Sequence, residues 1–298
     1  MALSIIDFAN GARPERQATL ALELDRALQA HGFVALTNPP VPVALQQRAF
    51  AAARAFFEQP EVAKAPFAYR DASANFGYQG PGVEALDPAQ PGDLKETFTM
   101  RAAVTDADPA LWPSEAFRAV SQALYLACTE AAMLLLRVFA RALGQAPDWF
   151  DDKHTGENMT LRFLRYPGGQ PEHAQALGAG AHTDYGSLTL LIQEGVPGLQ
   201  LRNADGSWWD CVPQAGQVLV NTGDLMAHWS NDRYPSTEHR VLPVQGLKDR
   251  YSIAFFMDPD SDVMVRCLPE MILDRPARYA DTTAGAHIQR KILATHST

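Results

Sequence analysis

The chain of 298 residues is poor in cysteine and in clustered charge. Only three cysteines occur, Cys128, Cys211 and Cys267, and none is paired at a motif spacing. Their odd number favours buried or incidental thiols in a reducing compartment. The net charge is −9, yet Lys and Arg are scattered and no run of five or more like charges occurs. This distribution gives no support to a nucleic-acid partner.

Targeting and nucleotide-binding signals are also missing. The segment MALSIIDFAN lacks a basic region followed by a long apolar stretch, so we expect no signal peptide. The most apolar segment, AAMLLLRVFARAL, is interrupted by Arg137 and Arg141 and is too short for a membrane span. There is no Walker motif, and GAGAHT lacks the third glycine of a dinucleotide fingerprint. We therefore expect a cytoplasmic protein with no membrane partner.

The first half of the chain is predicted to be mostly helical. Leucine and alanine recur at helical spacing in ATLALELDRALQAHG, and Gly32 fits a helix end. GFVALTN then predicts a short strand, and VALQQRAFAAARAFFEQ a second helix that ends at Pro60. Residues 71–93 are rich in Gly, Pro, Asp and Ala and predict a long loop. A long apolar helix is predicted from Ser114 to Gly144.

The second half, from Met159 to Asp258, alternates short strand-like runs with turn residues. The runs are MTLRFLRYP, SLTLLIQ, GLQLRN, SWWDCVP, QVLVNTGD, EHRVLPV and RYSIAFFMD. The pair Asp205-Gly206 is a strong hairpin signal. Many short strands without intervening helices indicate an antiparallel sandwich or jelly roll. The segment TTAGAHIQRKILATH near the end is predicted to be helical.

Two histidines and one carboxylate stand out as a possible metal site. His182 and Asp184 lie two residues apart in AHTDYGS, a spacing that places both side chains on one face of a strand. His239 lies in STEHRVL. This set matches the facial triad of non-haem Fe(II) oxygenases, which leaves the opposite positions of the metal open. The triplet alone is better explained by ordinary polar residues, so the prediction depends on further signals.

The strand RYSIAFF offers a possible site for an anion. Strand alternation places Arg250 and Ser252 on the same side, where a guanidinium and a hydroxyl can meet one carboxylate. An unpaired Arg facing an apolar interior would be costly, which predicts an anionic partner. Tyr166, in LRFLRYPGG, could add its phenol to that carboxylate, although a packing role explains it equally well.

A few other residues have both a structural and a functional interpretation. Asp224 fits a helix N-cap, and Asn231 fits a turn better than a place near the metal. Phe256 lies on the face of Arg250 by alternation, so it could wall a pocket or pack in the core. Phe76 and Tyr78 are candidates for a lid over the substrate.

Taken together and in order, these segments resemble the Fe(II)/2-oxoglutarate-dependent dioxygenases, in the branch related to isopenicillin N synthase. The resemblance covers almost the whole chain. It is carried by GFVALTNPPVP, ARAFFEQPEVAK, GDLKETFTM, LRFLRYPGG, AHTDYGSLTLLIQ, GLQLRN, VLVNTGDLMAHWSN, STEHRVLPV, RYSIAFFMDPD and TTAGAHIQRKILATH. It implies an α+β fold dominated by a double-stranded β-helix, or jelly-roll, core with flanking N-terminal helices and a C-terminal helix.

The resemblance also implies a division of the chain and a set of site residues. The regions would be a dioxygenase N-terminal region at 1–110, a scaffold helix region at 111–155, the jelly-roll core at 156–262 and a helical segment at 263–298. Fe(II) would be held by His182, Asp184 and His239. The cosubstrate 2-oxoglutarate would chelate the iron through its keto acid end. Its distal carboxylate would meet Arg250 and Ser252, with Tyr166 as a further contact.

The implied activity couples oxidative decarboxylation of 2-oxoglutarate, to succinate and carbon dioxide, with oxidation by O2 of a small organic molecule. Hydroxylation is the favoured outcome, ahead of desaturation or ring formation, in a protein expected to be monomeric. Three alternatives stay open. Related enzymes use O2 without 2-oxoglutarate and bind a substrate carboxylate with the Arg-x-Ser pair, and others break down 2-oxoglutarate to ethylene. A jelly-roll binding protein without redox chemistry is the third.

Overall fold

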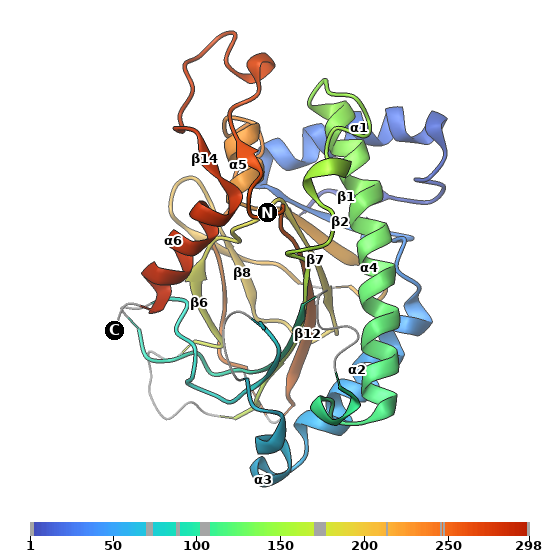
Figure 1. Cartoon of the computed structure of the whole chain (residues 1–298), viewed down its shortest axis with the longest axis vertical. Helices are drawn as coiled ribbons and strands as arrows, with labels where there is room; N and C mark the ends of the chain where they lie inside the picture. Colours follow the sequence, from blue (N-terminus) through green and yellow to red (C-terminus); the bar gives the residue numbers. More distant parts are fainter. Residues whose placement is uncertain are drawn as a thin grey trace.

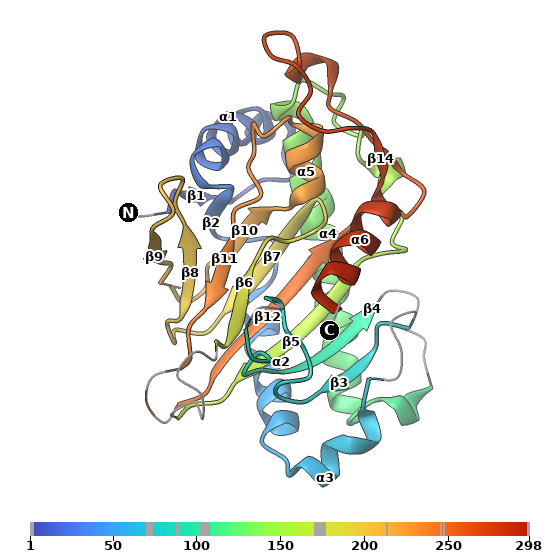
Figure 2. The same cartoon turned by 90° about the vertical axis from the view of Figure 1, so that its left-hand side faces the viewer.

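The computed structural model describes residues 3–69, 74–87, 90–101, 108–169, 177–212, 214–244, 246 and 248–296. An eight-stranded sheet and a four-stranded sheet form the body of the protein (Figures 1 and 2). The large sheet has the order β1 (Ile5–Asp7), β2 (Phe33–Thr37), β10 (Val218–Thr222), β7 (Leu188–Gln193), β12 (Arg250–Met257), β5 (Thr160–Tyr166), β4 (Glu96–Arg101) and β3 (Gly77–Gln79). The small sheet has the order β6 (Ala179–His182), β11 (His239–Val241), β8 (Leu199–Arg202) and β9 (Trp208–Asp210).

Helices cover one face of the large sheet and close one end of the fold. The helices are α1 (Pro14–His31), α2 (Val43–Phe57), α3 (Glu61–Lys64), α4 (Glu115–Ala142), α5 (Asp224–Trp229) and α6 (Ala284–His296). Helix α4 runs along the sheet and contacts α1, α2, β7 and β12. A small ribbon of β13 (Met264–Val265) and β14 (Thr282–Thr283) leads into α6.

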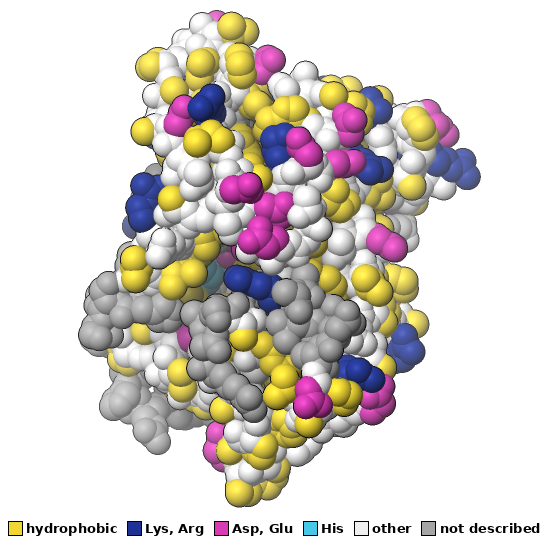
Figure 3. All heavy atoms as spheres, viewed as in Figure 1, with side chains coloured by type: hydrophobic (Ala, Val, Ile, Leu, Met, Phe, Trp, Pro, Cys, Tyr) yellow, Lys and Arg dark blue, Asp and Glu magenta, His cyan; other side chains and the backbone are white. Residues whose placement is uncertain are grey.

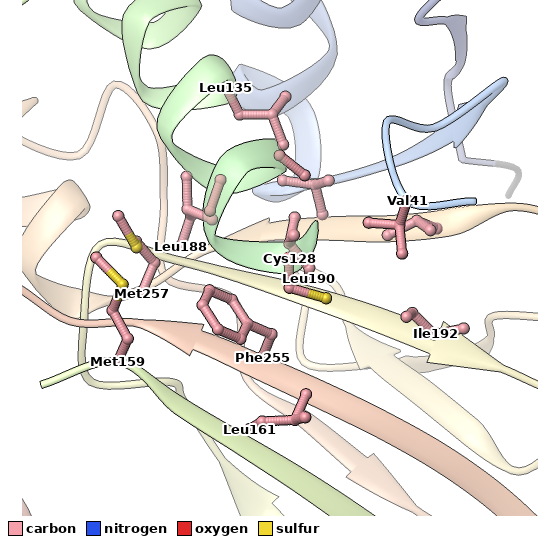
Figure 4. Packing of buried hydrophobic residues seen from close by; sticks show 14 of the residues in the cluster. Val41, Cys128, Leu135, Met159, Leu161, Leu188, Leu190, Ile192, Phe255 and Met257 are labelled. Carbon is pink, nitrogen blue, oxygen red and sulfur yellow. The ribbon is translucent and has the colours of Figure 1, made fainter. Parts of the chain in front are cut away.

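Strand alternation separates the core from the interior of the jelly roll. On β12, Tyr251, Ile253, Phe255 and Met257 join the main hydrophobic cluster beneath α4. Figure 4 shows how side chains of α4 meet this face of the sheet. The intervening residues of β12 point to the opposite side, into the space between the two sheets. The two-residue period predicted for RYSIAFF is therefore confirmed.

Most of the predicted elements are present. The two N-terminal helices, the long helix, the C-terminal helix and the seven strand-like runs correspond to α1, α2, α4, α6, β5 and β7–β12. Helix α1 ends at Gly32, whose φ of 62° lies in the left-handed region, and a Cβ there would approach the carbonyl oxygen of Pro235 to 2.1 Å. The hairpin at Asp205-Gly206 joins β8 to β9, with a φ of 85° at Gly206.

Three expectations about individual residues are wrong. The region predicted as a loop at 71–93 contains β3, although residues 71–73 and 88–89 lie outside the described part. Phe76 and Tyr78 do not form a lid, because they are buried in an aromatic cluster with Phe98. Asp224 is not an N-cap: Gly223 caps α5, and Asp224 is its first helical residue.

Helix α4 is longer than the apolar segment considered in the sequence. An 18-residue window of it has a mean hydropathy of 1.6, so by length and composition alone it could cross a membrane. In the fold 56% of that window is buried, and Cys128 and Leu135 pack towards the sheet (Figure 4). Because α4 packs against α1, α2 and the large sheet, its apolar composition is that of a core helix. Cys128, Cys211 and Cys267 are all free thiols.

Candidate active site

A cavity of about 280 Å³ lies between the two sheets and is closed on one side by α6. On the face seen in Figure 3, a histidine side chain is visible at the bottom of a hollow beside α6. All six residues singled out in the sequence line this cavity, namely Tyr166, His182, Asp184, His239, Arg250 and Ser252. Both sheets contribute, so only the closed jelly roll brings these distant segments together.

The predicted metal ligands meet at one end of the small sheet. His182 and His239 are direct partners across β6 and β11, with ring centroids 4.3 Å apart. Asp184 does not lie on the strand, as the spacing suggested, but two residues beyond the end of β6. Its Oδ1 lies 3.9 Å from Nε2 of His182 and 3.8 Å from Nε2 of His239. The three ligand atoms lie within 4.8 Å of one another, close enough to hold one metal ion.

Backbone carbonyl groups fix the protonation of both imidazoles. Nδ1 of His182 lies 2.8 Å from the carbonyl oxygen of Gly180, and Nδ1 of His239 lies 3.1 Å from that of Thr237. A carbonyl can only accept, so each Nδ1 carries the proton and each Nε2 keeps a free lone pair. This is the tautomer that binds metals through Nε2.

The carboxylate of Asp184 is held in the same way. Thr189 Oγ1 and Asn221 Nδ2 donate to its Oδ2 over 2.6 and 2.7 Å, which leaves Oδ1 directed at the histidines. Thr189 and Asn221 are themselves partners across β7 and β10. The neighbouring strands β7 and β10 of the large sheet therefore orient the carboxylate of Asp184, which follows β6 of the small sheet.

The electrostatic environment favours the metal-binding forms. Burial, followed by the charge of His239, lowers the pKa of His182 to about 3. Burial raises the pKa of Asp184, but the two histidines and the hydrogen bonds from Thr189 and Asn221 outweigh it and leave that pKa lowered. Near neutral pH the pair is thus a neutral imidazole and a carboxylate, the forms that coordinate metals.

Arg250 is a buried cation without a counter-ion in the described residues. It is 1% exposed. Its Nη2 donates to Gln193 Oε1 over 2.5 Å, its Nη1 lies 3.5 Å from Ser252 Oγ, and its Cζ lies 4.7 Å from the ring centre of Tyr166. Arg250 Nε and Gln193 Nε2 are buried without a hydrogen-bond partner. Burial lowers the pKa of Arg250, as expected for a cation removed from water.

Strand register orders the cavity along its length. At one end, Arg250 pairs with Tyr166, and Ser252 pairs with Gln193. We call these four residues the inner part. At the other end, a row across four strands contains Arg101, Thr160, Phe256 and Thr189. We call the cavity-facing residues Thr99, Arg101, Thr160 and Phe256 the outer part.

Comparison with known proteins agrees with this geometry. Residues 157–259 match the 2OG-Fe(II) oxygenase superfamily, and residues 3–130 match the N-terminal region of non-haem dioxygenases in morphine synthesis. The 2-oxoglutarate-Fe(II) type oxidoreductase hxnY of Emericella nidulans is 34% identical over 96% of this chain and 89% of its own. The chain belongs to the 2OG-Fe(II) oxygenase superfamily.

Two further similarities support the same assignment. The proline hydroxylase buaE of Petromyces alliaceus is 32% identical over 99% of this chain and 98% of its own. A crystal structure of a full-length Neurospora crassa protein with alpha-ketoglutarate (2-oxoglutarate) and thymine has a TM-score of 0.86 and 29% identity, over 98% of this chain and 97% of the other. The protein is an oxidoreductase that uses Fe(II), 2-oxoglutarate and O2, and the predicted jelly-roll fold is confirmed.

Several residues in or beside the cavity were not found from the sequence. Gln193, Thr189 and Asn221 contact the predicted site residues, but each gives only an ordinary strand signal in sequence. Phe256, left between wall and core, lines the cavity. Asn231 has a φ of 50° and donates to the carbonyl oxygens of Met271 and Pro276, which agrees with a turn role.

Proposed function

We propose that His182, Asp184 and His239 hold the Fe(II) of this oxygenase. The support is the convergence of two Nε2 atoms and one carboxylate oxygen, each oriented by a hydrogen bond to the opposite side of its group. Imidazole and carboxylate suit Fe(II) better than a thiolate site would. Three ligands on one side also leave the remaining positions open for a cosubstrate.

We further propose that the inner part binds the distal carboxylate of 2-oxoglutarate. The observation that carries this proposal is the guanidinium of Arg250, which is buried and has no anionic partner among the described residues. A desolvated cation is costly unless an anion compensates it, and the fork of an Arg matches a carboxylate. Ser252 and Tyr166 add hydroxyl groups, and the free Nε2 of Gln193 adds a donor that the sequence did not predict.

Iron held by His182, Asp184 and His239 would supply the activation of O2 that couples decarboxylation of 2-oxoglutarate, to succinate and carbon dioxide, with oxidation of the substrate. The protein positions the reactants. Arg250 would fix one end of the cosubstrate, and Asp184 and the two histidines would fix the metal at the other end. The distance between Arg250 and the metal ligands would therefore set the orientation of the keto acid. The two sheets and α6 surround the site, which reduces its contact with water.

We propose that the substrate is a small organic molecule and that hydroxylation is its fate. A cavity of about 280 Å³, shared with 2-oxoglutarate, supports a small substrate. The relative named as a proline hydroxylase and the structure with bound thymine point to small molecules too. A monomeric state, a cytoplasmic location, the absence of a nucleic-acid partner and the division at residues 110, 155 and 262 stay predictions.

An anaerobic titration tests the residue assignments. Purified apo-protein receives Fe(II) and then 2-oxoglutarate, and visible absorption is recorded. We expect a weak charge-transfer band that needs both additions, that is lost in His239→Ala and that needs far more 2-oxoglutarate in Arg250→Met. Iron binding without the band would refute the role of the inner part. Absence of iron binding would refute the metal site. Succinate formation under turnover excludes direct oxidation by O2.

A further inference from the structure

We propose that Arg101 binds a carboxylate group of the substrate, so that this oxygenase acts on a small organic acid with an apolar body about one ring in size. The inference rests on the proposed function, because it takes the inner part to be filled by 2-oxoglutarate. It concerns the outer part of the cavity, for which no residue has so far been given a role.

Strand register places Arg101 on the wall of the cavity. It is the last residue of β4, where it pairs with Thr160 of β5, and Thr160 pairs in turn with Phe256 of β12. The side chains of Phe98 and Met100, which alternate with it, lie in the hydrophobic core instead. Arg101 therefore points to the same side as Thr160 and Phe256, and all three line the cavity.

The other cations of this region are already compensated. Arg162 of β5 forms an ion pair with Glu84. Lys95 Nζ lies 3.2 Å from a carboxylate oxygen of Glu84 and 2.5 Å from one of Asp93. These four side chains balance in charge, two positive and two negative. Their net charge is therefore zero, although Nε of Arg162 is also buried without a hydrogen-bond partner among the described residues.

Arg101 differs because no carboxylate in the described residues forms an ion pair with it. Among the described residues, its buried Nε lacks a hydrogen-bond partner, and the same holds for Oγ1 of Thr99, two residues earlier on the same face. Donors shielded from water in this way are costly until a ligand accepts their hydrogen bonds. A carboxylate suits both, since its oxygens accept from a guanidinium and from a hydroxyl.

The charge of Arg101 acts on one acidic group of the cavity, Asp258. Burial and the nearby Asp184 raise the pKa of Asp258 to about 7, while Arg101 lowers it. No ion pair joins Asp258 to Arg101 among the described residues, and Nε of Arg101 keeps a free hydrogen-bond donor there. If Asp258 were the anchor instead, the substrate would carry an amine, and the experiment below separates the two cases.

The size of the substrate follows from the same register. Thr189 donates a hydrogen bond to the carboxylate of Asp184. Its strand lies three strand spacings from that of Arg101, which is roughly 14 Å between backbones at about 4.8 Å per strand. The side chains of Arg101 and Asp184 shorten that gap from either end. Phe256 lies between them, and Ile288 and Ile292 of α6 also line the cavity. The remaining space suits an apolar ring with a short acidic arm.

The test compares ring acids with their uncharged analogues. Binding of benzoate, phenylacetate and 3-phenylpropionate, of the three matching amides, and of 2-phenylethylamine is measured by calorimetry on iron-free protein with saturating 2-oxoglutarate. The variants are Arg101→Gln, Arg101→Lys and Arg250→Met, with Arg118→Gln as control because that side chain pairs only with Glu115 on the surface. Melting temperatures report whether each variant folds.

We expect at least one acid to bind the wild type about tenfold more tightly than its amide, as for a charged hydrogen bond. This preference should vanish in Arg101→Gln and persist in Arg250→Met and in the control. Should Arg101→Gln not fold, a reduced preference in Arg101→Lys with unchanged amide affinity supports the same conclusion. The proposal is wrong if acids and amides bind alike, if the amine binds best, or if the preference is lost only in Arg250→Met. Failure of the proposed function would appear separately, as a missing charge-transfer band.

Discussion

The inner and outer parts of the cavity are built differently. The inner part lies on β5, β7 and β12, which are central strands of the large sheet. Thr189 and Asn221 donate hydrogen bonds to Asp184, and Arg250 donates one to Gln193. In the outer part, Thr99 and Arg101 lie on β4, next to the edge strand β3, and α6 lines the same cavity. Rigid, buried hydrogen bonds hold groups within the small tolerance that catalysis needs, whereas an edge and a helix can adapt to a substrate. On the proposals made above, the inner part and the metal ligands serve the chemistry that the superfamily shares, and the outer part selects the substrate.

The variant Asp184→Asn is the sharpest test of the metal site. The amide keeps the shape of the side chain but loses the charge that balances the metal. If its oxygen accepts from Thr189 and Asn221, its NH2 group, a donor, faces the metal position instead of a carboxylate oxygen. We expect iron retention to be lost and 2-oxoglutarate decarboxylation to fall roughly 1,000-fold, equivalent to about 4 kcal/mol. Metal content and succinate production measure this. Asp210→Asn, at an exposed aspartate, is the control and should behave as the wild type.

Arg250→Met tests whether the inner part is built for a ligand rather than for stability. Methionine fills the space without leaving a desolvated charge, so the ligand-free protein should be at least as stable as the wild type. Loss of the guanidinium should nevertheless raise the KM for 2-oxoglutarate roughly 100-fold, as expected for about 3 kcal/mol of charged hydrogen bonding. Thermal unfolding and steady-state kinetics provide the two readouts. A clear drop in melting temperature would mean that Arg250 serves the fold.

Thr189→Val tests the orientation of the carboxylate ligand. The hydroxyl of Thr189 donates to Asp184 Oδ2 over 2.6 Å, and valine preserves the shape while removing that bond. Outer hydrogen bonds of this kind change metal affinity by about 10- to 100-fold. We expect weaker Fe(II) binding with little change in the KM for 2-oxoglutarate. Thr129→Val, which removes a hydroxyl bonded within α4, should leave both quantities unchanged.

The structure brings the predicted metal ligands and three residues of the inner part to one cavity, as the sequence indicated. His182, Asp184, Arg250 and Ser252 could be found because their chemistry is unusual for strands and their spacing of two residues is a local property. Tyr166 needed the further knowledge that it faces Arg250, which is a matter of register between β5 and β12. Local periodicity does not fix register, and for that reason the phenol contact stayed undecided.

Apart from Phe256, the outer part was not found from the sequence, and the packing of Phe76 and Tyr78 was not foreseen either. The ends of GDLKETFTM give no turn or charge signal that would distinguish Arg101 from a solvated strand terminus. Phe76 and Tyr78 looked like loop aromatics, but tertiary packing against Phe98 and Phe56 placed them in the core. Short strands such as β3 are decided by their partners more than by their own residues.

The variant Lys291→Met tests how α6 is attached over the outer part, and it has the smallest expected effect. Lys291 Nζ lies 3.0 Å from a carboxylate oxygen of Asp224 and donates to Thr183 Oγ1 over 2.9 Å, and its side chain is 33% exposed. Solvent screening limits such a pair to about 1 kcal/mol, so amide hydrogen exchange in α6 should rise about fivefold at most. Iron binding and the KM for 2-oxoglutarate should not change, and Lys248→Met on the surface is the control. A loss of iron binding in Lys291→Met would show that the two parts of the cavity are not independent, because a contact at the outer end would then govern the inner one.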